Sequence, residues 1–201
     1  MKRYFWFFLF GLITIGISAI IKIIRFPDES KQGIDVETAD VKGDIVQKDT
    51  AIFALENLDI VLHLSNKWNF VNRTTEGIYG FLENCNDTVF CTSMSSYRLD
   101  TDIYKASNSE LSEYFLQLFN EKYEKVGFIA SYELKNSSGM SFKCFDYKIY
   151  ERSHHFGTST AILSSDKGSV IINFLALNEP GGTYFKKKEG FINILKKIEP
   201  K

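Results

Sequence analysis

The sequence predicts an α+β fold: one domain with a six- or seven-stranded antiparallel sheet and two packed helices, preceded by a single transmembrane helix. Three observations support this prediction. Residues 1–26 contain a long uncharged stretch, residues 27–50 are acidic and lack aromatic rings, and the composition changes again over residues 51–201. In that last part, strand and amphipathic-helix patterns alternate with short turn-rich links. We therefore expect a transmembrane signal-anchor, a flexible tether and one folded domain, in that order.

The first segment is apolar all round. Tyr4–Ile21 carries no charge over eighteen positions, and Lys2, Arg3, Lys22 and Arg25 flank it. A helix over this stretch and the three residues after it would be roughly 31 Å long, which matches the hydrocarbon core of a bilayer. A cleaved signal peptide is the alternative, but its apolar core is usually shorter and ends in small residues. We expect an uncleaved anchor in a single-pass membrane protein.

The size of the flanking parts indicates the orientation. Basic residues before and after the apolar stretch are balanced, so the positive-inside rule barely discriminates. Only three residues precede the stretch, whereas a large domain follows it. We expect the amino terminus inside and the domain outside, in an extracytoplasmic (periplasmic or extracellular) location.

Charge separates the tether from the domain. Residues 27–50 contain seven acidic and three basic residues, too polar a segment to bury much apolar surface, so a flexible acidic tether is predicted. In residues 51–201, 18 acidic residues are balanced by 17 basic ones. Because this domain has no basic excess to neutralise phosphates, nucleic acid is not expected as a partner.

Alternating apolar positions and turn signals predict the strands. We expect seven of them, three before the first helix and four after it: Leu58–Leu64, Ile78–Leu82, Val89–Tyr97, Phe128–Leu134, Phe142–Tyr150, Thr158–Leu163 and Ser169–Leu177. Short links between consecutive strands require antiparallel pairing, because a parallel return needs a crossover of about a dozen residues or more.

Two helices are predicted to pack on this sheet. The first has apolar residues at spacings of three and four from Leu111 to Val126, with a capping box at Ser107 and Glu110 and a terminating Gly127. The second is expected over Tyr184–Ile198, with a packed face formed by four residues: Phe185, Phe191, Leu195 and Ile198.

The order of these elements, together with Trp68 after a short polar turn (Leu64-Ser-Asn-Lys-Trp68), resembles the PsbP-like superfamily. Tyr114 and Phe115 in the first helix and the closing Phe191–Ile198 helix belong to the same likeness. The superfamily includes extrinsic photosystem II proteins, a Ran-binding import factor family and small bacterial envelope proteins. The resemblance implies an accessory binding or assembly protein rather than an enzyme, and it transfers no binding residues.

The three cysteines suggest one disulfide. Cys85 and Cys91 flank the predicted turn between two strands, so they could form a bridge in an exported domain. The alternative is two unpaired thiols. Cys144 has no evident partner and is expected to be a buried thiol, because no base is adjacent to it in sequence. Without C-x-x-C spacing, a structural zinc site is not expected, and the sequence assigns no cofactor or metal.

Histidines and aspartates offer no recognised catalytic pattern. His63 is expected on the strand face opposite Leu62 and Leu64, and it has no assigned nucleophile. The adjacent His154 and His155 point to opposite sides of an extended chain, so we expect a solvated turn there rather than a metal site. Another group, Asp100-x-Asp102, lacks the glycine and distal glutamate of a calcium loop and is expected to be a solvated loop or a helix cap.

Basic residues cluster on the closing helix. Lys186, Lys187 and Lys188 are consecutive, and such a run near a bilayer can contact anionic lipid headgroups. The alternative is a solvated outer face.

Together, these features favour a membrane-anchored, extracytoplasmic accessory protein that docks a protein partner at the cell envelope and is not an enzyme. Two alternatives stay open. A small-ligand or lipid carrier would need an apolar cavity of several hundred Å³. An enzyme without a sequence motif would need a pocket that holds one of the imidazoles against a carboxylate.

Overall fold

The computed structural model describes residues 50–71, 78–83, 92–152, 154–178 and 183–201. The predicted transmembrane helix and, except for its last residue, the predicted tether lie outside them. Among the described residues, no helix is long and apolar enough to cross a bilayer.

The described elements alternate much as the sequence predicts. The strands are β1 (Thr50–Leu55), β2 (Ile60–Ser65), β3 (Trp68–Val71), β4 (Tyr79–Glu83), β5 (Ser93–Leu99), β6 (Lys125–Lys135), β7 (Ser141–Glu151), β8 (His154–Ser165), β9 (Gly168–Leu177) and β10 (Glu199–Pro200). The helices are α2 (Asn108–Asn120) and α3 (Thr183–Lys196), with short 3₁₀ turns at Glu56–Leu58 and Ile103–Lys105.

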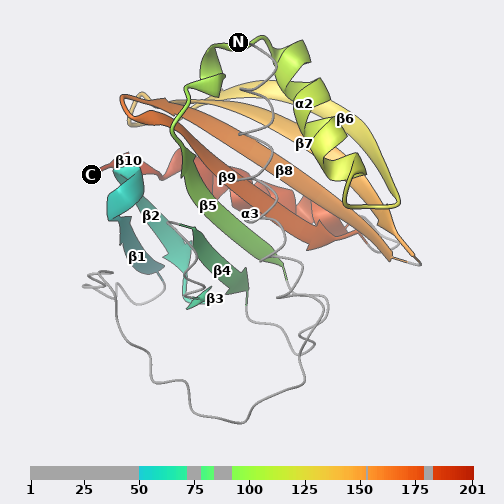
Figure 1. The fold of residues 1–201 in the computed structure, drawn as a ribbon. Coiled ribbons are helices and arrows are strands. Elements are labelled where there is room, and N and C mark those ends of the chain that lie inside the picture. The colour runs from blue at the N-terminus through green and yellow to red at the C-terminus, as the bar shows by residue number, and fades with distance from the viewer. Residues whose placement is uncertain (1–49, 72–77, 84–91, 153, 179–182) are drawn as a thin grey trace.

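A seven-stranded sheet forms the centre of the described fold (Figure 1). Its strand order is β3-β4-β5-β9-β8-β7-β6, and every neighbouring pair is antiparallel. The four strands from β6 to β9 form a meander, as their short links predict. The α+β class and a seven-stranded antiparallel sheet are therefore confirmed, but its members differ from the prediction: β3 was not predicted, and the predicted strand Leu58–Leu64 corresponds to β2, which is not part of this sheet.

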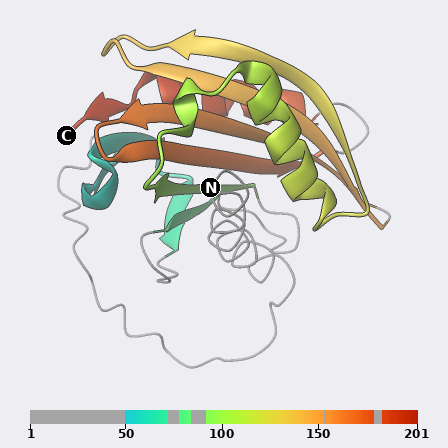
Figure 2. The same cartoon turned by 45° about the horizontal axis from the view of Figure 1, so that its top comes forward.

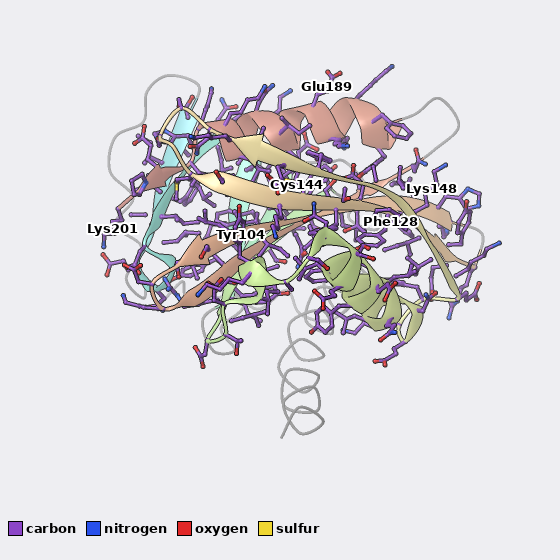
Figure 3. All side chains as sticks on the ribbon, turned by 90° about the horizontal axis from the view of Figure 1, so that it is seen from above. Tyr104, Phe128, Cys144, Lys148, Glu189 and Lys201 are labelled. Atoms are coloured by element: carbon purple, nitrogen blue, oxygen red, sulfur yellow. The ribbon has the colours of Figure 1, made fainter. Side chains whose placement is uncertain are left out.

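The two helices cover opposite faces of this sheet (Figure 2). Seen from above in Figure 3, α3 lies on one side, α2 lies on the other, and Cys144 lies between them in β7. Each face carries its own apolar core: one includes Phe145 and Tyr147 against α2, and the other includes Phe142 and Cys144 against α3. Alternate residues of β7 thus point into different cores.

A second, three-stranded sheet corrects the prediction of a single sheet. β1, β2 and β10 pair antiparallel in the order β1-β2-β10, so the last described strand lies beside β2 (Figure 1). Leu62 and Leu64 of β2 face the same core as α3. The small sheet and α3 therefore share one layer over the large sheet.

Helix α2 begins as predicted and ends earlier. Ser107 Oγ accepts the Glu110 backbone N–H, and Glu110 Oε2 accepts the Ser107 N–H, which confirms the capping box. The predicted extension to Gly127 is wrong. Asn120 Oδ1 accepts the Val126 N–H at 3.2 Å, and the chain has by then entered β6.

Candidate functional site

A cleft of about 380 Å³ opens beside α3. We call it the α3 cleft. One wall is formed by α3, which contributes Lys186, Lys187, Gly190 and Asn193, and by Lys197 immediately after the helix. Four of these residues have the spacing i, i+4, i+7 and i+11, so they follow one stripe along the helix. Tyr184, Leu195 and Ile198 point elsewhere and are buried in the core.

The opposite wall comes from β2 and the turn that follows it. It contains His63, Ser65, Lys67 and Trp68. His63 and Ser65 lie on the strand face that does not enter the core, because side chains alternate along a strand. The predicted position of His63 opposite Leu62 and Leu64 is confirmed, since both leucines are fully buried.

An apolar base closes the cleft from below. Phe174, Phe191 and Ile194 line it and are themselves buried. At one end, Lys187 Nζ donates to Glu83 Oε2 at 3.0 Å and to Thr92 Oγ1 at 2.5 Å. This end of the cleft is therefore internally paired.

The rest of the cleft is positively charged. Among the described residues, no carboxylate lies within ion-pair distance of Lys67, Lys186 or Lys197, and all three side chains are exposed. Glu83, the one carboxylate among the described residues that line the cleft, is engaged by Lys187. An unneutralised concave basic surface attracts anionic ligands, because its walls focus the field.

His63 has a carboxylate neighbour. Its Nε2 lies 3.5 Å from Glu199 Oε2, brought close by the pairing of β10 with β2. That nitrogen is buried, so it faces the carboxylate rather than the open cleft. A general base must reach its substrate's proton, so in this imidazole the role would fall to the other ring nitrogen, Nδ1.

The three consecutive lysines point in different directions. Lys186 is exposed at the cleft, Lys187 is paired with Glu83, and Lys188 Nζ donates to Asp146 Oδ2. Lys188 is only 19% exposed and its partner carboxylate 2%. The run therefore presents no continuous basic face. Its contact with lipid headgroups stays a prediction.

Beneath α3 lies a buried polar network centred on Asp146. Ser159 Oγ donates to Asp146 Oδ1 at 2.7 Å and lies 2.8 Å from the Tyr184 hydroxyl. The Tyr184 hydroxyl also donates to the Thr158 carbonyl at 3.2 Å. The Lys188 ammonium group stands 4.7 Å from the ring centroid of Tyr132. These contacts fix α3 on the sheet.

Cys144 lies beside this network and is buried, as predicted. Burial raises the pKa of its thiol to about 12, and the nearby Asp146 charge acts in the same direction. A thiol with so high a pKa is a poor nucleophile at neutral pH. The predicted Cys85–Cys91 bridge lies outside the described residues.

The other predicted positions are dispersed. His154 and His155 open β8 instead of forming a turn, because they pair with Glu151 and Tyr150 of β7, although both are exposed. Asp102 accepts hydrogen bonds from two serine hydroxyls, Ser164 and Ser169, and so ties the loop before α2 to the β8–β9 hairpin. Within the described ranges, no group of three or more potential ligands could hold a metal ion.

The sequence reasoning missed the cleft as a unit. Its two walls are far apart in the chain, and only the fold brings Trp68 and Lys67 opposite α3. The available signal was the stripe of Lys186, Gly190, Asn193 and Lys197 at helical spacing. That stripe contains no apolar residue, so it marks the face of α3 that is turned away from the core.

A second cavity is much smaller. It has a volume of about 20 Å³ and lies near the end of α2, between Phe119 and polar residues of β5 and β9 that include Ser95 and Asn173. This space is enough for about one water molecule.

Comparisons with known proteins identify the fold. No protein-family model and no curated protein matches the chain. The structure of the Saccharomyces cerevisiae Ran-binding protein Mog1p is similar at a TM-score of 0.52 and 10% identity, covering 76% of this chain and 95% of that one. A variant of Mog1 gives a TM-score of 0.51 at 10% identity, covering 76% and 96%.

A Pseudomonas aeruginosa protein of unknown function, PA94, is similar at 10% identity over 76% of this chain and 98% of its own, with a TM-score of 0.49. Identities this low establish likeness of fold alone. The two Mog1 structures therefore show a fold like that of this chain.

Proposed function

We propose that this chain is a membrane-anchored accessory protein that binds a protein partner outside the membrane and does not catalyse a reaction. The α3 cleft is its contact surface. The observation that carries the proposal is the cleft itself: a concave, basic surface with an apolar base and with exposed lysines on both walls. Aromatic and apolar groups bordered by charged ones are the usual anatomy of a protein-binding surface.

Two further observations support a binding role. The Nε2 atom of His63 is buried against Glu199, which leaves only Nδ1 of this imidazole for any proton transfer in the cleft. The similar fold of Mog1p belongs to a protein named for binding another protein, Ran. Likeness of fold is an analogy and names no partner for this chain.

Membrane attachment is the second part of the proposal. Its support is the uncharged stretch Tyr4–Ile21 with basic residues on both sides. We expect the full chain to stay in the membrane pellet after alkaline carbonate extraction. A chain that is released, or that is found trimmed and free in the medium, would contradict the anchor.

Site-directed photocrosslinking of the full-length chain in its own membrane tests the binding role. A photoreactive amino acid replaces Lys186 or Asn193 inside the cleft. Matched control positions are Glu189, on the outer side of α3, and Lys148, on the far part of β7 (Figure 3). We expect both cleft positions to give an adduct with the same protein, and the controls to give none.

A defined pair of results would contradict the proposed function. If neither cleft position gives a protein adduct while a domain lacking residues 1–26 restores full biological activity, the proposed function is wrong.

A further inference from the structure

We propose that the α3 cleft binds an extended acidic peptide segment of the partner, whose backbone runs along α3 and approaches it most closely at Gly190, and whose carboxylates reach Lys186 and Lys197. This inference rests on the proposed function and specifies the chemistry of the partner. Charge complementarity, the shape of the cleft and the position of one glycine point to this occupant.

Gly190 has no structural reason to be glycine. It lies inside α3, where glycine is one of the least favourable residues, and its φ lies outside the left-handed range that would require glycine. A Cβ atom added there would meet nothing within 4 Å, so packing does not exclude alanine. The space that the missing side chain leaves opens into the cleft. A ligand backbone could therefore approach the helix backbone closely at this point.

The charges stand at suitable separations for an extended chain. Lys186 in α3 and Lys197, the residue directly after the helix, are eleven residues apart, which is about 16 Å along the helix axis. In an extended peptide, side chains four residues apart lie on one face and about 13 Å apart. Flexible lysine side chains easily span the small difference. Two acidic residues at i and i+4 therefore fit the two ends of the stripe.

Between the charged ends, the cleft offers apolar contact. Trp68 lines the wall opposite α3, and Phe191 and Ile194 form the base below Gly190. An apolar side chain midway between the two acidic residues would cover these groups. Lys67, on the Trp68 side, adds a third positive charge for the peptide's acidic groups or carbonyl oxygens.

A lipid surface fits these observations less well. Headgroup binding favours a flat, protruding basic face, whereas Lys187 and Lys188 turn inward to Glu83 and Asp146. The remaining lysines line a concavity whose base is apolar. A peptide can enter such a concavity, and a bilayer cannot.

The test measures peptide binding to the full chain in nanodiscs of neutral phosphatidylcholine. Trp6→Phe leaves Trp68 as the only tryptophan, so its fluorescence reports binding inside the cleft. The probe is the blocked octapeptide Ala-Glu-Ala-Leu-Ala-Glu-Ala-Ala. Control peptides replace both glutamates by glutamine or place them side by side. We expect saturable binding of the probe, and binding at least about threefold weaker for each control.

Three variants of cleft residues and one control variant locate the binding. Lys186→Gln and Lys197→Gln should each weaken probe binding about threefold, whereas Lys196→Gln, on the same helix but outside the cleft, should leave it unchanged. Gly190→Ala should raise the melting temperature by roughly 2–4 °C, because alanine is the better helix former. It should nevertheless weaken probe binding at least about fivefold, because its methyl group occupies the path of the peptide. If Gly190 had only a structural role, its replacement by alanine would not raise the melting temperature and weaken probe binding at the same time.

Several outcomes would overturn the inference. One is unchanged affinity in Gly190→Ala, and another is equal loss in Lys196→Gln and Lys197→Gln. Stronger binding to phosphatidylserine vesicles than to the probe would assign the cleft to lipid. Tighter binding of a synthetic peptide covering residues 28–49 would assign it to the chain's own acidic segment.

Failure of this inference differs from failure of the proposed function. If photocrosslinking from the cleft captures a partner that persists in Gly190→Ala while the probe does not bind, the function stands and the peptide chemistry is wrong. If the probe binds as expected but no partner is captured, and a domain lacking residues 1–26 restores full biological activity, the function is wrong.

Discussion

The ring of Tyr184 fills the space in front of Gly157. A Cβ atom at Gly157 would lie 2.2 Å from two ring carbons of Tyr184. Residue 157 of β8 must therefore have no side chain if α3 is to pack there. These ring atoms lie near the base of the side chain, and the Tyr184 hydroxyl is held by Ser159. The ring therefore has little freedom to move aside.

We predict that Gly157→Ala destabilises the fold by about 1–3 kcal/mol, the usual cost of overpacking a core. Gly127→Ala in β6 is the matched control, because a Cβ atom there meets nothing within 4 Å. That control should be neutral or stabilising by up to about 1 kcal/mol. Urea unfolding of both variants measures the difference, and equal stabilities would show that Tyr184 does not occupy this position.

The ion pair between Lys188 and Asp146 is buried and shared with Ser159. Lys188→Met would leave a carboxylate in an apolar core without its counter-charge, which typically costs about 3–5 kcal/mol. Adding Asp146→Asn removes the unpaired charge and still lets the amide oxygen accept from Ser159. We expect the double variant to be more stable than Lys188→Met, as measured by a double-mutant cycle in urea.

Comparing Lys188→Met with the double variant shows whether Lys188 stabilises the fold through its charge or through its packing. If Lys188→Met alone costs less than about 1 kcal/mol, water reaches Asp146 and the pair is not buried in solution. If both variants are equally destabilised, the loss comes from packing of the lysine stem rather than from charge.

At the scale of elements, the sequence predicts the start of α2 and the approximate bounds of α3 but not the buried side of α3. The start of α2 is encoded locally, because Ser107 and Glu110 cap each other within one turn. In α3 the sequence indicated a helix but not the side that it buries. Phe185, predicted to pack, is 49% exposed, and Tyr184 is fully buried in its place. The choice depends on Gly157, which lies 27 residues away.

Among the strands too, some can be predicted from their own residues and others depend on a partner far away in the sequence. β7 is predicted correctly, although residues 144–147 are buried in succession, so both of its faces are covered. The small sheet was missed, because β10 has only two residues and becomes a strand by pairing with β2. His63 lies in β2 and Glu199 in β10, so local sequence patterns could not predict that these two residues come together.

Asp59 joins the small sheet to the large one. It lies just before β2 with φ of 57°, and its carboxylate accepts from Arg98 of β5 and from Lys167 of the β8–β9 turn, each at 3.0 Å. The hydrogen bond from Lys167 lowers the pKa of Asp59 below its usual value of 3.8, and the charges of Lys167 and Arg98 act in the same direction against partial desolvation.

A lowered pKa means that the charged form of Asp59 stabilises the folded state. This contribution is present at neutral pH and is lost as the pH falls below about 4, through the lowered pKa of the folded state. We predict that Asp59→Asn is less stable than the natural chain at pH 7 and equal to it near pH 2. Asparagine tolerates the same positive φ, so backbone strain does not enter.

Urea unfolding at several pH values measures this convergence. Asp166→Asn, an exposed aspartate in the turn that carries Lys167, serves as the control and should show no pH-dependent difference. A deficit in Asp59→Asn that persists unchanged at pH 2 would assign the effect to hydrogen-bond geometry rather than charge.

At the scale of the whole molecule, one sheet separates two cores. α2 packs on one face through Leu118 among others, and α3 packs on the other through Leu195. The central strands β7, β8 and β9 contribute residues to both cores. Because the same strands line both cores, unfolding one core would disrupt the sheet on which the other packs. The described domain should therefore unfold as one cooperative unit.

We predict that Leu118→Ala and Leu195→Ala each cost about 2–5 kcal/mol, because both leucines are fully buried and alanine leaves a cavity. Exposed neighbours on the same helices, Gln117→Ala and Lys196→Ala, should change stability by less than about 0.5 kcal/mol. Calorimetry and urea unfolding, followed by circular dichroism and by Trp68 fluorescence, should give one transition for every variant. Trp68 packs against the core on the α3 side of the sheet. If the α2 side of Leu118→Ala unfolded first, circular dichroism would change at a lower urea concentration than Trp68 fluorescence. Such a separation would mean that the α3 cleft can stay folded without α2, and the two cores would then be independent.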